Sequence, residues 1–149
     1  MNAICTAAKN GVNVIILTSG PNSDVPMSRF ASQHIYNEFL QAGVRIFEYE
    51  INTLHAKTVA IDDIYSMVGT FNLDFLSGLK LLEVNVSMLN SHVTEELKNQ
   101  FLNDLKGSKE INLNSLKKRT KFETIFHRIC YSISKTLELF ITEHDETKN

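Results

Sequence analysis

Short apolar runs of strand length alternate with helical segments along the first fifty residues, and this alternation limits the fold more than any other feature. Residues 12–17 (VNVIIL) form a β-branched run suited to a strand that is covered on both faces. A helix is predicted over 27–41, with Gly43 just past its end, and a second strand over 44–49. Strands mixed with covering helices predict an α/β layered domain, a mixed β-sheet flanked by helices.

The same patterns assign the rest of the chain. They predict a helix over 2–10, an antiparallel strand pair over 54–61 and 65–68 joined at Asp62-Asp63, a strand over 83–89 and a helix over 92–106. Residues 108–116 are polar and predict a loop. A long amphipathic helix is predicted over 117–142, with a basic start and apolar residues at helical spacing. Packing on the core and binding to an anionic membrane surface both suit such a helix.

Composition excludes several classes of protein. The 149 residues carry a net charge of −2, which argues against nucleic acid as the main partner. Cys5 and Cys130 are too few for a disulfide framework or a zinc site, so a reduced, intracellular setting is expected. The sequence has neither a run of 18 apolar residues nor the basic start and apolar stretch of a signal peptide.

Residues able to handle a phosphodiester gather between positions 54 and 86. In the predicted strand, His55 and Lys57 lie two residues apart and would share a face. A neutral imidazole can attack phosphorus while the ammonium draws a phosphate oxygen. The Thr70 hydroxyl and the Asn72 amide can donate to the non-bridging oxygens. Glu83 is the candidate acceptor that fixes the other imidazole nitrogen. Taken without these partners, His55 and Lys57 could also be two polar residues on the solvent face of a partly exposed strand.

This spacing resembles the HKD motif of the phospholipase D superfamily. His55-x-Lys57-x₄-Asp62 is followed after six residues by Gly69-Thr70-x-Asn72, and Glu83 lies where the family has the carboxylate that pairs with the histidine. The resemblance implies that His55 is the nucleophile or general acid, that Lys57 and Asn72 bind phosphate, and that Asp62 is more structural than chemical. Thr70 stands where serine is usual, so the hydroxyl is kept.

The resemblance extends over about residues 3–110, which look like the second half of bacterial cardiolipin synthases. It divides the chain into a half-domain over 1–110 and a C-terminal helical extension over 111–149. The chain has one HKD motif where this family has two, and the other histidines lack a lysine two residues later. From the resemblance we expect the family's first strand to be absent, because Met1 falls inside the expected first helix, and likewise the membrane helices that begin typical cardiolipin synthases.

Three functions follow from the resemblance as expectations. The first is a phosphatidyltransferase or phosphodiesterase that converts phosphatidylglycerol to cardiolipin and glycerol through a phosphohistidine, without a metal or other cofactor. The second HKD half would come from a homodimer mate or a separate N-terminal chain, and the protein would lie at the periphery of the bacterial inner membrane. The second is an inactive C-terminal fragment or binding domain of a split enzyme. The third is a small homodimeric endonuclease of the same superfamily.

Overall fold

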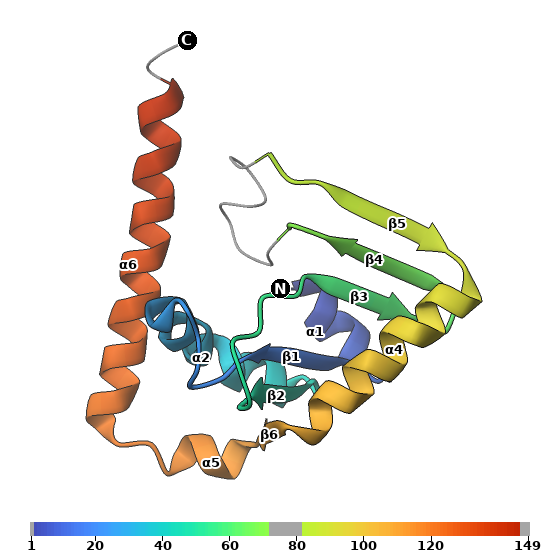
Figure 1. The fold of residues 1–149 in the computed structure, drawn as a ribbon. Coiled ribbons are helices and arrows are strands. Elements are labelled where there is room, and N and C mark those ends of the chain that lie inside the picture. The colour runs from blue at the N-terminus through green and yellow to red at the C-terminus, as the bar shows by residue number, and fades with distance from the viewer. Residues whose placement is uncertain (1, 72–81, 147–149) are drawn as a thin grey trace. The chain divides into compact units, whose positions relative to one another are not determined.

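The chain divides into two compact units, each with its own three-stranded sheet among the described residues (Figure 1). The computed structural model describes residues 2–71 and 82–146. Unit 1 comprises residues 1–54 and 107–136, and unit 2 comprises residues 55–106 and 137–149.

Unit 1 contains a mixed sheet with the order β1-β2-β6. Strands β1 (Ile15–Ser19) and β2 (Arg45–Tyr49) are parallel, and the helix α2 (Pro26–Gln41) connects them. The third strand, β6 (Ser108–Ile111), runs antiparallel to β2. Gly43 follows α2 with φ +93°, a left-handed backbone that glycine adopts without steric cost and that turns the chain into β2.

The core of unit 1 lies between this sheet and its helices. α1 (Asn2–Lys9) contributes one buried residue, and α2 contributes two. The buried cluster consists of Cys5, Tyr36, Phe39, Ala42, Val44, Ile46 and Ile111. Central β2 supplies the most deeply buried member, Ile46, because a middle strand is covered by neighbours on both edges.

The buried carboxylate of Glu48 links α2 to β2. Glu48 is 3% exposed and accepts from Arg29 Nη2 at 2.6 Å, from Gln33 Nε2 at 2.6 Å and from the Tyr36 hydroxyl at 3.1 Å. Burial and the neighbouring Glu48 raise the pKa of Tyr36, so its hydroxyl stays a donor. Arg119 Nη1 donates to the Gln33 carbonyl at 3.1 Å, and burial lowers the pKa of this guanidinium. Glu48 is therefore a paired buried charge that links β2 to α2, and Arg119 joins the segment before α6 to α2 through the Gln33 carbonyl.

The region after Gly107 differs from the prediction. Residues 108–116 are not a loop, because β6 and the short helix α5 (Leu113–Lys117) occupy most of that stretch. The long helix α6 (Lys121–Glu146) begins four residues later than predicted. The Thr120 hydroxyl accepts from the Glu123 N–H at 3.1 Å, and the Glu123 carboxylate accepts from the Thr120 N–H at 2.7 Å. This reciprocal capping box fixes where the helix begins.

Within unit 1, one face of α6 packs against α2. His127 and Cys130 are buried, the rings of Phe30 and His127 stack at 5.5 Å, and those of His34 and Tyr131 lie 4.9 Å apart. Cys130 is a free, buried cysteine on this packed face. In the part of the chain that the structure describes, no helix is long and apolar enough to cross a bilayer.

Unit 2 is an antiparallel meander covered by one helix. Its sheet has the order β3-β4-β5, and α4 contacts each strand. The bounds are β3 (Thr58–Ile61), β4 (Tyr65–Gly69), β5 (Asn85–Leu89) and α4 (Ser91–Lys106). Asp62 and Asp63 form the predicted turn between β3 and β4, with φ +50° and +58°, and the Ile64 N–H donates to the Ile61 carbonyl at 3.3 Å.

The predicted fold class is confirmed: the chain is an α/β protein with a mixed sheet, flanking helices and a C-terminal helix. The differences lie in strand bounds. The strand predicted over 12–17 is Ile15–Ser19, the one over 54–61 begins only at Thr58, and the one over 83–89 begins at Asn85. Sequence pattern places the starts of these three strands two to four residues too early, because a strand begins only where its residues pair with a neighbouring strand.

Candidate active site

Four of the predicted site residues lie at one end of the unit 2 sheet, where β3 and β5 begin and β4 ends: His55, Lys57, Thr70 and Glu83. Lys57 directly precedes β3, Thr70 directly follows β4, and Glu83 lies two residues before β5. The Gly69 N–H donates to the Lys57 carbonyl at 3.1 Å, and the Thr70 N–H donates to the Val84 carbonyl at 3.0 Å. These two bonds extend the sheet by one step and hold the three segments side by side.

His55 and Lys57 lie in the segment that leads into β3, so the prediction that both stand on a strand is wrong. The reason lies in β4, which ends at Gly69 opposite Lys57, so that residues before Lys57 have no β4 residue to pair with. Lys57 Nζ donates to the His55 carbonyl at 2.9 Å, which holds the ammonium close to the backbone of the histidine. His55 is exposed and Lys57 is half-buried.

The side chains of Thr70 and Glu83 are in direct contact. The Thr70 hydroxyl donates to Glu83 Oε2, and its oxygen accepts from the Val84 N–H at 3.0 Å. A hydroxyl has a single proton, so in this arrangement Thr70 positions the carboxylate. Its predicted role as a phosphate donor requires that the proton turn away from Glu83.

Gly69 is a site residue for which the sequence predicts a place in the motif but no role. A Cβ atom at this position would lie 2.0 Å from Asn85 Oδ1 and 2.4 Å from the Val84 carbonyl oxygen. Asn85 Oδ1 also accepts from the Phe71 N–H at 3.4 Å, so the amide lies against the end of β4. The available signal was a glycine at the end of a predicted strand, which marks a close backbone approach.

One predicted residue, Asp62, does not join this group. Asp62 lies in the hairpin turn at the opposite end of β3 from Lys57, where its neighbour Asp63 pairs with Lys98 on α4. This placement agrees with a structural task for Asp62 in the turn. Asn72 falls outside the described residues.

The end of the sheet thus combines three chemical functions. His55 provides an imidazole, Lys57 a cation, and Glu83 a carboxylate that Thr70 holds. An imidazole can serve as nucleophile or proton donor at phosphorus, a cation stabilises the charge that develops on phosphate oxygens, and a carboxylate can orient an imidazole. This set of groups suits attack on a phosphodiester.

Known proteins are similar in sequence to most of this chain. Residues 1–105 match the family described as cardiolipin synthase, phospholipase D-like domain. The chain is 34% identical over 137 residues to cardiolipin synthase A of Wigglesworthia glossinidia brevipalpis, covering 92% of this chain and 28% of that protein. Cardiolipin synthase A of Yersinia pseudotuberculosis is 47% identical over 77 residues, or 52% of this chain and 16% of that protein.

A solved structure has the same fold. Nuc of Salmonella typhimurium, a phospholipase D family member, superimposes with a TM-score of 0.63 at 18% identity, covering 74% of this chain and 72% of that one. The chain spans about 28% of the length of several cardiolipin synthases that it matches. The predicted phospholipase D-like fold is therefore confirmed, and the chain belongs to the cardiolipin synthase, phospholipase D-like domain family.

Proposed function

We propose that this chain supplies one half of the active site of a phosphatidyltransferase of the cardiolipin synthase type. The observation that carries the proposal is the meeting of His55, Lys57, Thr70 and Glu83 at one end of the β3-β4-β5 sheet. Family membership and the likeness to cardiolipin synthases support it. In this proposal residues 1–110 form the half-domain, and residues 111–149 form its helical extension.

The proposed reaction has two displacements at phosphorus. A ring nitrogen of His55 attacks the phosphodiester of phosphatidylglycerol, the bond from phosphorus to the glycerol headgroup breaks, and the glycerol oxygen takes a proton from a general acid. A hydroxyl of a second phosphatidylglycerol then attacks the phosphohistidine and gives its proton to the same group. The bond to His55 breaks, and the products are cardiolipin and glycerol.

The neighbours of His55 have separate tasks in this scheme. Lys57 draws a phosphate oxygen and stabilises the charge of the transition state. Glu83 orients the imidazole, and Thr70 positions Glu83 through its hydroxyl. Asn72 donates to a phosphate oxygen, and Asp62 supports the hairpin.

The chemistry requires a second histidine as the general acid, and the sequence has one HKD motif. We assign that histidine to a homodimer mate or to a separate N-terminal chain. The substrate is an anionic phospholipid, which places the reaction at a membrane surface, and we expect peripheral attachment at the bacterial inner membrane.

Incubation of the purified protein with phosphatidylglycerol vesicles tests the proposal. Cardiolipin and glycerol are the expected products, His55→Ala abolishes them, and Lys57→Gln lowers the rate by about 10²–10³-fold. His92→Ala is the matched control, because His92 is an exposed histidine on α4 beside Glu96. Absence of product from a folded protein of dimeric mass, or equal rates for wild type and His55→Ala, would overturn the proposal.

The single motif favours a second candidate function. In that alternative, the chain is the non-catalytic C-terminal part of a split enzyme, and it becomes active only with a partner that carries the first motif. Addition of such an N-terminal half separates the two functions. Turnover that appears only after the addition, and that still depends on His55, supports the split enzyme.

A further inference from the structure

Helix α6 has a second apolar face, which remains exposed. Residues 121–136 of the helix pack on unit 1 through Phe126, His127, Cys130 and Tyr131, and the Phe126 ring meets Phe30 edge-on at 5.2 Å. Four other large apolar side chains are exposed: Phe122 (78%), Ile125 (57%), Ile129 (50%) and Ile133 (44%). At about 100° per residue, these four lie on the side of the helix away from His127 and Tyr131. We call them the outer face of α6.

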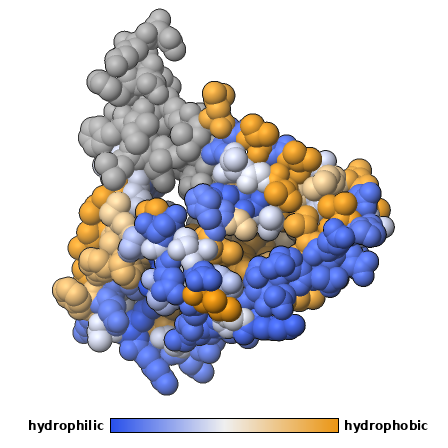
Figure 2. Space-filling view, in the orientation of Figure 1, coloured by the Kyte–Doolittle hydropathy of each residue, from blue (hydrophilic) through white to orange (hydrophobic). Residues whose placement is uncertain are grey.

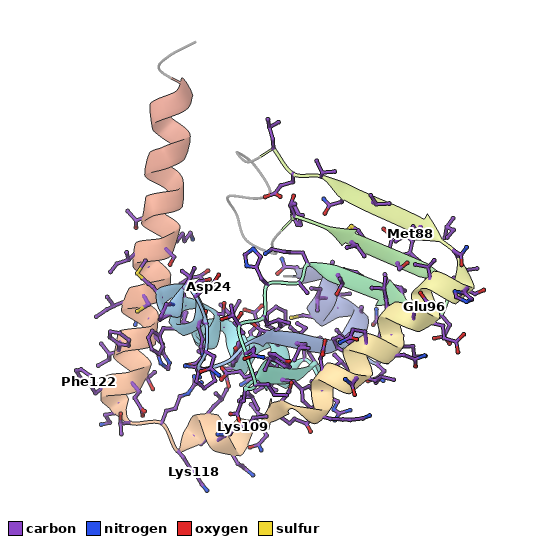
Figure 3. The ribbon with its side chains drawn as sticks, viewed as in Figure 1. Asp24, Met88, Glu96, Lys109, Lys118 and Phe122 are labelled. Carbon is purple, nitrogen blue, oxygen red and sulfur yellow. The ribbon has the colours of Figure 1, made fainter. Side chains whose placement is uncertain are left out.

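The outer face forms a continuous stripe. From Phe122 to Ile133 it runs for about 16 Å along the helix axis. Figure 2 shows apolar side chains at the left edge of the view, below the grey atoms, where Figure 1 places this part of α6. Phe122 and the preceding Lys118 mark the start of the stripe in Figure 3. A contiguous exposed apolar patch of this kind indicates an interaction surface.

A row of basic residues runs along one side of the stripe. Lys121, Arg128 and Lys135 recur every seven residues, so they fall on one line of the helix, and all three are exposed. Between positions 121 and 136 the sequence has one acidic residue, Glu123, whose carboxylate is bound at the cap by the Thr120 N–H. Hydrogen bonds from Thr120 lower the pKa of Glu123, which keeps its charge at the cap. Lys117 and Lys118 lie just before the helix.

We propose that the outer face of α6 docks on the surface of an anionic phospholipid bilayer. An apolar stripe with a basic flank is the pattern of helices that lie in the membrane interface, with the apolar side chains among the acyl chains and the cations at the headgroups. Two copies paired through this face would bring their two basic rows together, with one acidic residue in each copy, so the cations would repel one another. Charge therefore favours the anionic lipid as the occupant. The inference rests on the proposed function for the lipid class, because phosphatidylglycerol is anionic.

Vesicle sedimentation with the whole chain tests the docking face. Vesicles of phosphatidylglycerol and phosphatidylcholine should pellet the protein, and vesicles of phosphatidylcholine alone should bind it at least tenfold more weakly. The triple variant Lys121→Gln/Arg128→Gln/Lys135→Gln should lose about a hundredfold in affinity, since each cation near an anionic surface contributes roughly fivefold. Its matched control changes three exposed lysines outside the face: Lys9, Lys106 and Lys109.

The apolar stripe has its own pair of variants. Ile129→Asn/Ile133→Asn should abolish pelleting, whereas Val12→Ser/Ile51→Asn, at positions 53% and 59% exposed, should leave it unchanged. The chain has no tryptophan, so Phe122→Trp introduces a single fluorophore. Its emission should shift to the blue and be quenched by brominated lipid, and that of Val12→Trp should not.

The outcomes separate lipid docking from its alternatives. Equal binding of the face variants and their controls overturns the proposal, as does a folded wild type that binds no anionic vesicle. Conversion of a dimer to a monomer by Ile129→Asn/Ile133→Asn without vesicles would assign the face to a second copy instead. His55→Ala should pellet like the wild type, so failure of the docking face and failure of the proposed chemistry give different results.

Discussion

Substitution of Gly69 by alanine tests the close approach on which the candidate site depends. The added methyl group would lie 2.0 Å from Asn85 Oδ1 and 2.4 Å from the Val84 carbonyl oxygen, at least 1 Å inside ordinary contact. The Asn85 side chain can rotate away, but the carbonyl belongs to the backbone. The end of β4 must therefore move away from the segment before β5, which weakens the 3.0 Å bond from the Thr70 N–H to that carbonyl.

The magnitude follows from these two effects. Overpacking costs about 1–3 kcal/mol, and a weakened backbone hydrogen bond costs about 1 kcal/mol, so Gly69→Ala should destabilise the protein by roughly 2–4 kcal/mol. For a chain of this length the melting temperature should fall by roughly 5–15 °C. The same movement separates Thr70 from Glu83, and the proposed transferase activity should fall even where the protein is folded.

Thermal unfolding followed by circular dichroism measures the first effect. Asn85→Ala in the Gly69→Ala background should recover only part of the loss, because the overlap with the Val84 carbonyl remains. Gly11→Ala is the control: it adds the same methyl group where no atom lies within 4 Å, and it carries only the strain of φ +90°. A Gly69→Ala protein that melts no lower than Gly11→Ala would refute the argument from close approach.

Three further predictions concern unit 1. Glu48→Gln should cost roughly 3 kcal/mol in urea unfolding, because Arg29 loses its buried partner, and an unchanged midpoint would contradict this. Burial and the nearby Arg119 hold the pKa of His127 in the folded protein below 6.5, so this histidine binds a proton more readily in the unfolded chain. The free energy of unfolding should therefore be greatest above about pH 6.5 and decline toward pH 5, and His127→Gln should flatten this dependence. Thr120→Ala should cost about 1 kcal/mol by removing the cap of α6, measured as lost helix content and a lower melting temperature, and Thr120→Ser should restore both.

Much of the architecture could be predicted because apolar spacing and turn residues mark several helices and strands locally. The helices at Pro26–Gln41 and Ser91–Lys106 have regular apolar spacing over four turns and match their predictions within one residue. The hairpin at Asp62-Asp63 was predicted from two turn residues between alternating strands, and both adopt the positive φ that such turns require. The local pattern is enough to place an element where the residues that end it, such as a turn pair or a glycine, lie next to it in the sequence.

The parts that the sequence misplaced depend on partners elsewhere in the chain. β6 is four residues long and pairs with β2, about sixty residues earlier, so no local pattern announces it. The start of β3 depends on where β4 ends, which placed His55 and Lys57 outside the strand. The start of α6 was readable from Thr120 and Glu123, since threonine followed three residues later by glutamate is a capping box.

The candidate site could be predicted as a set of residues but not as a geometry. Residue type and spacing indicate His55 and Lys57, and the resemblance adds Glu83, whereas the contact of Thr70 with Glu83 depends on the pairing of segments thirteen residues apart. His55 and Thr70 are exposed at the end of the sheet, although transfer of a phosphatidyl group without hydrolysis requires that water be kept from the phosphohistidine. Under the proposed function, the reaction requires a general acid and a cover that excludes water, and the described residues at this end of the sheet supply neither. A single partner surface, carrying a second histidine and closing over this end of the sheet, would meet both.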